Sequence, residues 1–136
     1  MKNPLRTIML VEDDPDLQLI TRITLEVSGG YSVRVCGGGA EAVLTARAYP
    51  PDLILLDLTM PGMDGLATIA ALREFPELAT TPVIFFTANN QDEIRRDLLR
   101  RGALGVIVKP IEPDALVAQI RTLWQESETD APAGQS

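Results

Sequence analysis

The sequence of 136 residues contains no histidine and a single cysteine, Cys36. The absence of histidine excludes histidine metal ligands, a histidine general base, and Ser-His or Cys-His nucleophile pairs within the chain. One cysteine excludes an internal disulfide and is typical of proteins that are kept in the reducing cytoplasm. Any chemistry of this protein must therefore depend on other side chains, such as carboxylates, hydroxyls and lysine.

The sequence also lacks long apolar runs and an excess of positive charge. No run approaches the roughly 18 residues that span a bilayer, and the first residues lack the apolar core of a signal peptide. A net charge of −7 argues against direct binding to nucleic acid or to anionic membranes. With 46% hydrophobic and 23% charged residues, the chain is expected to form one ordinary cytoplasmic domain that is not inserted into a membrane.

Short apolar runs alternate along the chain with amphipathic segments of helical spacing. The apolar runs are Ile8–Val11, Tyr31–Val35, Leu53–Leu56, Val83–Phe86 and Gly105–Val108, and the helix-like segments lie near 15–27, 39–48, 64–74, 91–101 and 112–126. Nearly continuous apolar runs are typical of strands that are covered on both faces. The repeats therefore predict an α/β fold, a doubly wound five-stranded parallel sheet with right-handed crossovers and helices on both faces.

This predicted domain covers residues 1–126. The remaining residues, 127–136, read "SETDAPAGQS" and predict a disordered tail, either a plain terminus or a cut linker. A second segment, "CGGGA" at 36–40, lacks the lysine and the glycine spacing of a phosphate-binding loop. We interpret it as a flexible loop.

Polar residues stand where the predicted strands end. The residues at these ends are Glu12, Asp13 and Asp14 after the first run, Asp57 after the third, Thr87 at the fourth and Lys109 after the fifth. Asp14 precedes a proline and is explained as the N-cap of a helix. Taken singly, Asp57, Thr87 and Lys109 are explained as a turn cap, a strand residue and a surface charge. Glu12 and Asp13 lie before the cap and are not explained by it. Their coincidence favours one site, because ligands of doubly wound sheets bind beyond the carboxyl ends of the strands.

A hard divalent cation explains why acids gather at this edge. If the first and third strands are neighbours, Asp13 and Asp57 converge with Glu12 beside them, and their repulsion pushes at least one carboxyl toward protonation. Mg²⁺ relieves this repulsion through one or two carboxylates and retained waters, and it leaves room for phosphate oxygens. Lys109 and Thr87 are suited to stabilising a phosphoryl group. The carboxylate of Asp57 can then attack phosphorus as a nucleophile.

Four motifs, "LVEDDP", "LILLDLTMPGMDG", "VIFFTA" and "GVIVKP", occur in this order within residues 5–125. Together they resemble the receiver domain of two-component response regulators. The resemblance implies a flavodoxin-like sheet of strand order 2-1-3-4-5. It also implies that a sensor histidine kinase or a histidine phosphotransfer protein donates a phosphoryl group to Asp57.

The resemblance further implies a role for each site residue. Asp13 and Asp57 would be direct carboxylate ligands of Mg²⁺, and the backbone carbonyl of Thr59 would complete the protein part of the metal shell. Glu12 replaces the more usual aspartate of the acidic pair, and its longer arm is expected to reach the ion through water. The two remaining matches are Thr87 as the signalling hydroxyl and Lys109 as the essential lysine.

The sequence departs from this family at Val106, where receivers commonly carry a tyrosine or phenylalanine that turns inward when the threonine moves. Valine is small and stiff at χ1, so it cannot make this movement. We therefore expect the signal to pass through the loop Ala88–Gln91 and the helix 91–101, whose four arginines either contact a downstream partner or form a solvated face. Because no output domain follows, we expect a stand-alone receiver of the chemotaxis type or a receiver excised from a longer protein.

Three classes of function remain open. The favoured class is a signalling module that is not an enzyme beyond weak self-catalysed phosphoryl transfer and hydrolysis. A Mg²⁺-dependent phosphatase with an aspartyl nucleophile is the second, but enzymes of the haloacid dehalogenase type need an acid where this chain has Thr59. The third is a receiver-like interaction domain that is never phosphorylated, which the complete set of site residues disfavours.

Overall fold

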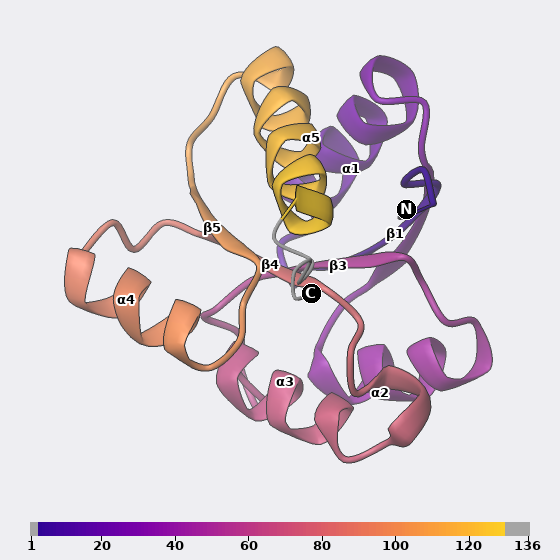
Figure 1. The fold of residues 1–136 in the computed structure, drawn as a ribbon, viewed down its shortest axis with the longest axis vertical. Helices are drawn as coiled ribbons and strands as arrows, with labels where there is room; N and C mark the ends of the chain where they lie inside the picture. The colour runs from indigo at the N-terminus through magenta and orange to yellow at the C-terminus, as the bar shows by residue number, and fades with distance from the viewer. Residues whose placement is uncertain (1–2, 130–136) are drawn as a thin grey trace.

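The computed structural model describes residues 3–129 and contains a five-stranded parallel sheet of order β2-β1-β3-β4-β5 (Figure 1). The strands are β1 (Thr7–Val11), β2 (Ser32–Cys36), β3 (Leu53–Leu56), β4 (Val83–Thr87) and β5 (Gly105–Val108). Each begins and ends within one residue of its predicted apolar run. The predicted α/β fold, its strand order and its flavodoxin-like architecture are confirmed.

Helices cover both faces of the sheet, as predicted. They are α1 (Pro15–Ile23) with the π-helical turn η1 (Thr24–Ser28), α2 (Gly39–Ala48), α3 (Gly65–Arg73) with the short turn η2 (Pro76–Leu78), α4 (Asp92–Arg100) and α5 (Pro113–Thr129). Figure 1 shows α1 and α5 on one face and α2 and α3 on the other, with α4 beside β5. None of these described helices combines the length and the apolar character that a membrane crossing requires.

The last helix is longer than predicted, because α5 ends at Thr129 rather than at 126. The first residues of the predicted tail are therefore helical. The rest of that tail, 130–136, lies outside the described residues.

The first helix begins where the sequence predicts it. The carboxylate of Asp14 accepts hydrogen bonds from the backbone N–H groups of Asp16, at 2.9 Å, and Leu17, at 3.3 Å, and Pro15 occupies the first helical position. Such a cap satisfies N–H groups that have no partner inside the helix. The predicted N-cap is confirmed, and it accounts for this acid without any role in the site.

The hydrophobic core lies on both faces of the sheet. In β1, Met9 and Val11 pack into a cluster with residues of α2 and α3, whereas Ile8 and Leu10 pack into a second cluster with residues of α5. Burial of alternate residues on opposite faces explains why the strands read as continuous apolar runs. The core thus fixes the carboxyl ends of the strands along a common edge.

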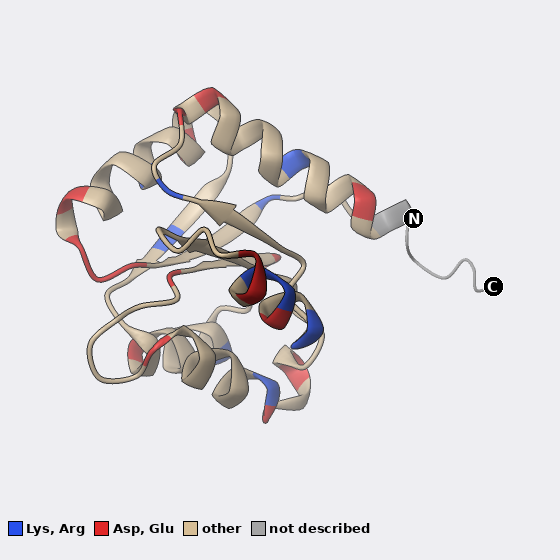
Figure 2. Cartoon of the chain, turned by 90° about the vertical axis from the view of Figure 1, so that its left-hand side faces the viewer, with Lys and Arg blue, Asp and Glu red and all other residues tan. Residues whose placement is uncertain are grey.

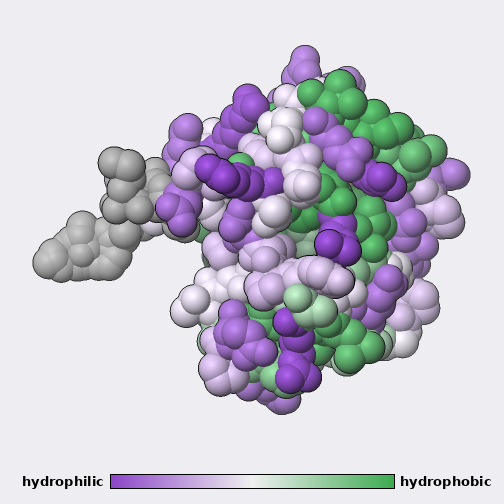
Figure 3. Space-filling view, turned by 90° about the vertical axis from the view of Figure 1, so that its right-hand side faces the viewer, coloured by the Kyte–Doolittle hydropathy of each residue, from purple (hydrophilic) through white to green (hydrophobic). Residues whose placement is uncertain are grey.

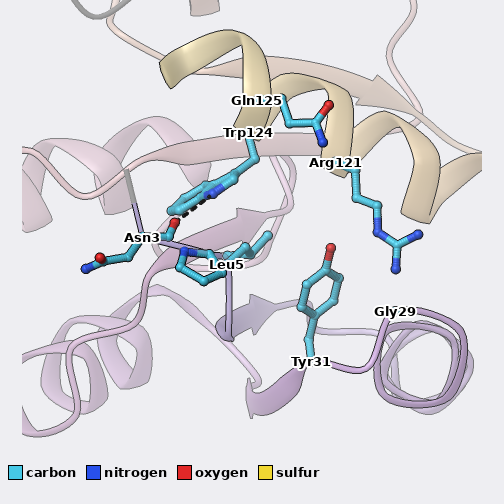
Figure 4. Close-up of a pocket in the computed structure, with 8 residues that line it drawn as sticks. Asn3, Leu5, Gly29, Tyr31, Arg121, Trp124 and Gln125 are labelled. Carbon is cyan, nitrogen blue, oxygen red and sulfur yellow. Dashed lines mark hydrogen bonds between the residues drawn. The ribbon is translucent and has the colours of Figure 1, made fainter. Parts of the chain in front are cut away.

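A surface pocket of about 360 Å³ lies at the opposite edge of the sheet (Figure 4). Leu5, just before β1, and Tyr31, just before β2, line it together with residues of α5. The indole Nε1 of Trp124 donates to the backbone carbonyl of Asn3 at 3.2 Å, which ties the start of the chain to α5. Because this pocket lies at the amino ends of the strands, it is remote from the acidic residues that follow β1.

Candidate functional site

The predicted acids converge beyond the carboxyl ends of β1 and β3. The two strands are neighbours, and the N–H of Asp57 donates to the carbonyl of Val11 at 3.0 Å. One carboxylate oxygen from each of Glu12, Asp13 and Asp57 lies within 4.8 Å of the others. Glu12 and Asp57 are buried, whereas Asp13 is exposed. The arrangement offers a hard cation oxygen ligands at one accessible point.

Lys109 follows the edge strand β5, and its side chain extends toward the acids that follow β1 and β3. Its Nζ lies 2.7 Å from Glu12 Oε1 and 3.7 Å from Asp57 Oδ2. The ammonium also lies 5.2 Å from the ring centroid of Phe86, and its side chain is only 13% exposed. A buried charge needs such partners, since burial without them is costly. The ion pair with Glu12 was missed by the sequence analysis, which assigned both residues to phosphate and metal alone.

The carboxyl of Asp57 resists ionisation. Burial, together with the nearby charges of Glu12 and Asp13, raises its pKa to about 6, against the lowering effect of Lys109 and of the N–H of Thr59. A divalent cation among these acids would act in the opposite direction, because a positive charge favours the ionised form. The electrostatics of the site therefore suit a cation beside this carboxyl.

Glu12 is held on both sides of its carboxylate. Oε1 accepts from Lys109, and Oε2 accepts from the backbone N–H of Asp14 at 3.2 Å. These bonds leave Asp13 and Asp57 as the acids that are freer to bind a metal directly. The water-mediated role of Glu12 stays a prediction. The side chain of Gln18 also donates to the backbone carbonyl of Glu12, at 2.6 Å; no motif in the sequence signals this contact.

The predicted hydroxyl and the predicted carbonyl ligand lie at the same edge. Thr87, at the end of β4, is buried, and its Oγ1 accepts from the backbone N–H of Asn89 at 3.1 Å. Its carbonyl accepts from the N–H of Lys109 at 2.8 Å. Thr59 follows the acid at the end of β3, and its N–H donates to Asp57 Oδ1 at 3.3 Å. The role of its carbonyl as a metal ligand stays a prediction.

Two glycines let the loop after β3 pack closely. A Cβ at Gly65 would lie 2.6 Å from the backbone oxygen of Asp57, so only glycine allows α3 to begin this near the acid. A Cβ at Gly39 would clash with the hydroxyl of Thr68 and with the thioether of Met63. The interpretation of 36–40 as a flexible loop is therefore wrong for Gly39, which is buried in the first turn of α2. The glycine run was the only available signal for this packing.

Comparison with known proteins agrees with the geometry. The family model for the response regulator receiver domain matches residues 8–121. The probable C4-dicarboxylate response regulator DctR of Halalkalibacterium halodurans is 36% identical over 126 residues, which are 92% of this chain and 54% of that protein. The nitrate/nitrite response regulator NarL of Escherichia coli K12 is 38% identical over 114 residues, covering 82% of this chain and 51% of that protein.

A solved structure shows the same architecture. The chemotaxis protein CheY4 of Vibrio cholerae has a TM-score of 0.81 and 27% identity, over 88% of this chain and 99% of that chain. The chain spans about half the length of the first curated relatives it matches. The family match over most of the chain, the strand order and the acids at the carboxyl edge lead to one conclusion: this chain belongs to the response regulator receiver domains of two-component systems.

Proposed function

We propose that this chain accepts a phosphoryl group on Asp57 with Mg²⁺ bound beside it, and that phosphorylation switches the binding of a partner protein. The observation that carries the proposal is the place of the Asp57 carboxyl, which lies within 4.8 Å of two further acids and 3.7 Å from the ammonium of Lys109. The acids suit a hard cation, and the lysine suits a phosphoryl oxygen.

The donor set fits Mg²⁺ in its chemistry. Asp13 and Asp57 offer carboxylate oxygens, the ligands that a small hard cation prefers, and we assign the carbonyl of Thr59 as a third protein ligand. When bound, the ion would neutralise charge on the phosphoryl oxygens. The raised pKa of Asp57 supports the assignment. The positive charge of Lys109 does not offset the effects of burial and of the neighbouring acids on this carboxyl, and a bound cation would.

The given sequence contains no histidine, so a phosphohistidine donor would lie outside it. A carboxylate oxygen of Asp57 attacks phosphorus, and the bond from phosphorus to the donor imidazole nitrogen breaks, with its electron pair left on that nitrogen. The Lys109 ammonium and the Thr87 hydroxyl donate to the phosphoryl oxygens, which stabilises charge as the group moves. We infer a sensor histidine kinase or a histidine phosphotransfer protein as donor.

The surface beside Lys109 supports a docked donor. A groove of about 420 Å³ opens there, and apolar side chains of α1 and of the segment after β5 line it, among them Leu17 and Ile111. The groove continues into exposed apolar residues on α1, where Ile20 is 59% exposed. Figure 3 shows hydrophobic surface on the side of the molecule where α1 and α2 lie. A helix that presents a phosphohistidine would cover this surface while it delivers the group.

We further propose that the protein acts in the cytoplasm as a signalling module and not as an enzyme, with only weak self-catalysed transfer and hydrolysis. A phosphatase of the haloacid dehalogenase type is disfavoured, because Thr59 stands where those enzymes carry their second acid. The hydroxyl and N–H of this residue offer no strong general acid or base.

The stoichiometry of labelling tests this function. After incubation with Mg²⁺ and acetyl phosphate, intact mass should show one adduct of about 80 Da per chain that persists on the timescale of the measurement. Consumption of many equivalents of acetyl phosphate without an accumulated adduct would indicate a phosphatase. No adduct and no consumption would indicate an interaction domain that is not phosphorylated.

A further inference from the structure

The backbone carbonyl of Glu12 lies just beyond the end of β1, where the pairing of the sheet stops. The last backbone bonds of this strand are those from Asp57 N–H to the carbonyl of Val11 and from Glu12 N–H to the carbonyl of Cys36, both at 3.0 Å. The next carbonyl, that of Glu12, accepts instead from Nε2 of Gln18 at 2.6 Å. A side chain from α1 thus provides the partner for the first peptide of the acidic loop.

This bond bears on the metal site through the peptide that joins Glu12 to Asp13. The carboxylate of Glu12 is already fixed by Lys109 and by the N–H of Asp14. Asp13 is the exposed acid of the cluster, so its place near Asp57 depends on the orientation of that peptide. A fixed carbonyl fixes the orientation of this peptide, and with it the direction in which the Asp13 side chain extends from the backbone.

The amide of Gln18 also lies near the turn after β2. A Cβ at Gly37 would be in ordinary van der Waals contact with Gln18 Nε2, at 3.8 Å. That turn is itself fixed, because the N–H of Gly37 donates to Glu41 Oε1 at 2.8 Å. The bond from this amide to the Glu12 carbonyl is partly buried, so water competes with it less than at an exposed site.

We propose that Gln18 is a positioning residue of the metal site, which sets the place of the Asp13 carboxylate by holding the carbonyl of Glu12 and so raises the affinity for Mg²⁺. The inference rests on the proposed binding of Mg²⁺ and adds to it a residue that touches neither the ion nor the phosphoryl group. Groups that orient metal ligands without binding the metal commonly have effects of this kind.

Two variants separate positioning from charge. Gln18→Met keeps the length of the side chain and removes the donor, and Gln18→Glu keeps the shape, removes the donor and adds a negative charge. Both should weaken Mg²⁺ binding by about three- to tenfold in calorimetric titration at fixed pH and ionic strength. Charge alone would make Gln18→Glu bind Mg²⁺ more tightly, so the two accounts differ in sign. Gln119→Met, on the exposed face of α5, is the matched control and should bind as the unaltered chain does.

A second measurement needs no metal. In the presence of a chelator, the amide hydrogen of Asp14 should exchange faster in Gln18→Met, because the loop that carries its bond to Glu12 is no longer held. If the unaltered chain binds Mg²⁺ and Gln18→Met binds it equally well, the positioning role is wrong and the proposed function stands. If the unaltered chain fails to bind Mg²⁺, both are wrong.

Discussion

Lys109 Nζ lies nearer to Glu12 Oε1, at 2.7 Å, than to Asp57 Oδ2, at 3.7 Å. The lysine is therefore held beside the proposed acceptor by the other buried acid. A phosphoryl group on Asp57 would offer it a new anionic partner, and the ammonium could turn to it without leaving the site. We therefore expect Glu12 to contribute to phosphoryl binding through the lysine as well as to the metal site.

Removal of the lysine should destabilise the fold as well as end phosphorylation. Lys109→Met leaves Glu12 buried without its cation, so the free energy of unfolding should fall by about 2–4 kcal/mol. Chemical denaturation checks this value. Arg22→Met, which breaks an exposed pair with Glu26, should cost less than about 1 kcal/mol. Equal losses in the two variants would contradict the buried network.

The pKa of Asp57 predicts how stability depends on pH without Mg²⁺. A carboxyl whose pKa is raised to about 6 in the folded protein binds its proton more tightly there than in the unfolded chain. The contribution of this bound proton to stability is therefore complete at pH values below the ordinary pKa of aspartate. It is lost as the pH rises through about 6. In a chelator at about pH 8, Asp57→Asn should be more stable than the unaltered chain by roughly 1–3 kcal/mol.

Denaturation at several pH values measures that difference. It should shrink toward about pH 4, where the aspartate is itself neutral. Asp16→Asn, at an exposed position in the first turn of α1, controls for the loss of one negative charge. A destabilised Asp57→Asn at about pH 8 would show that Lys109 outweighs burial and the neighbouring acids.

The two acids after β1 should differ in their contribution to metal binding. Asp13 is exposed and free to bind the ion, whereas both oxygens of Glu12 already accept hydrogen bonds. Asp13→Ala should therefore lose more Mg²⁺ affinity than Glu12→Ala in parallel titrations. The reverse order would mean that Glu12 is the direct ligand and Asp13 acts through water.

The switch should pass from Thr87 into α4. Thr87 Oγ1 accepts from the N–H of Asn89, so a phosphoryl group that draws the hydroxyl away removes a bond from the loop that leads to α4. Val106 is too small to follow the threonine, and a pocket of about 440 Å³ lies open beside it, between α4 and α5. Figure 2 shows α4 with acidic and basic residues on its surface, a face that a partner could recognise.

Amide chemical shifts with and without beryllofluoride, a phosphoryl mimic, test this route. Large changes over 87–101 with small changes over 105–108 are expected. Dominant changes around Val106 and α5 would show that the signal passes through the last strand and helix instead.

Most of the fold could be predicted from the sequence, because four of the five strands are nearly continuous apolar runs and each site residue stands at or just beyond the end of a strand. The order of the strands came from a resemblance, since local patterns such as "LILLD" do not state which strands are neighbours. Contacts between residues far apart in the sequence could not be predicted from local patterns. Lys109 pairs with an acid 97 positions away, and no sequence motif distinguishes Gln18 from the other polar residues of its helix. The packing role of Gly39 was hidden for the same reason, because its neighbours come from another loop and helix.

The central claim is that Asp57 alone accepts the phosphoryl group, and peptide-level mass spectrometry after acetyl phosphate and Mg²⁺ tests it most directly. The unaltered chain and Asp16→Asn should gain about 80 Da on the peptide that contains Asp57, and omission of Mg²⁺ should abolish the gain. Asp57→Asn should gain nothing, because its amide has nearly the same shape but lacks the anionic nucleophile. Equal labelling of Asp57→Asn, or an adduct on another residue of the unaltered chain, would contradict the account.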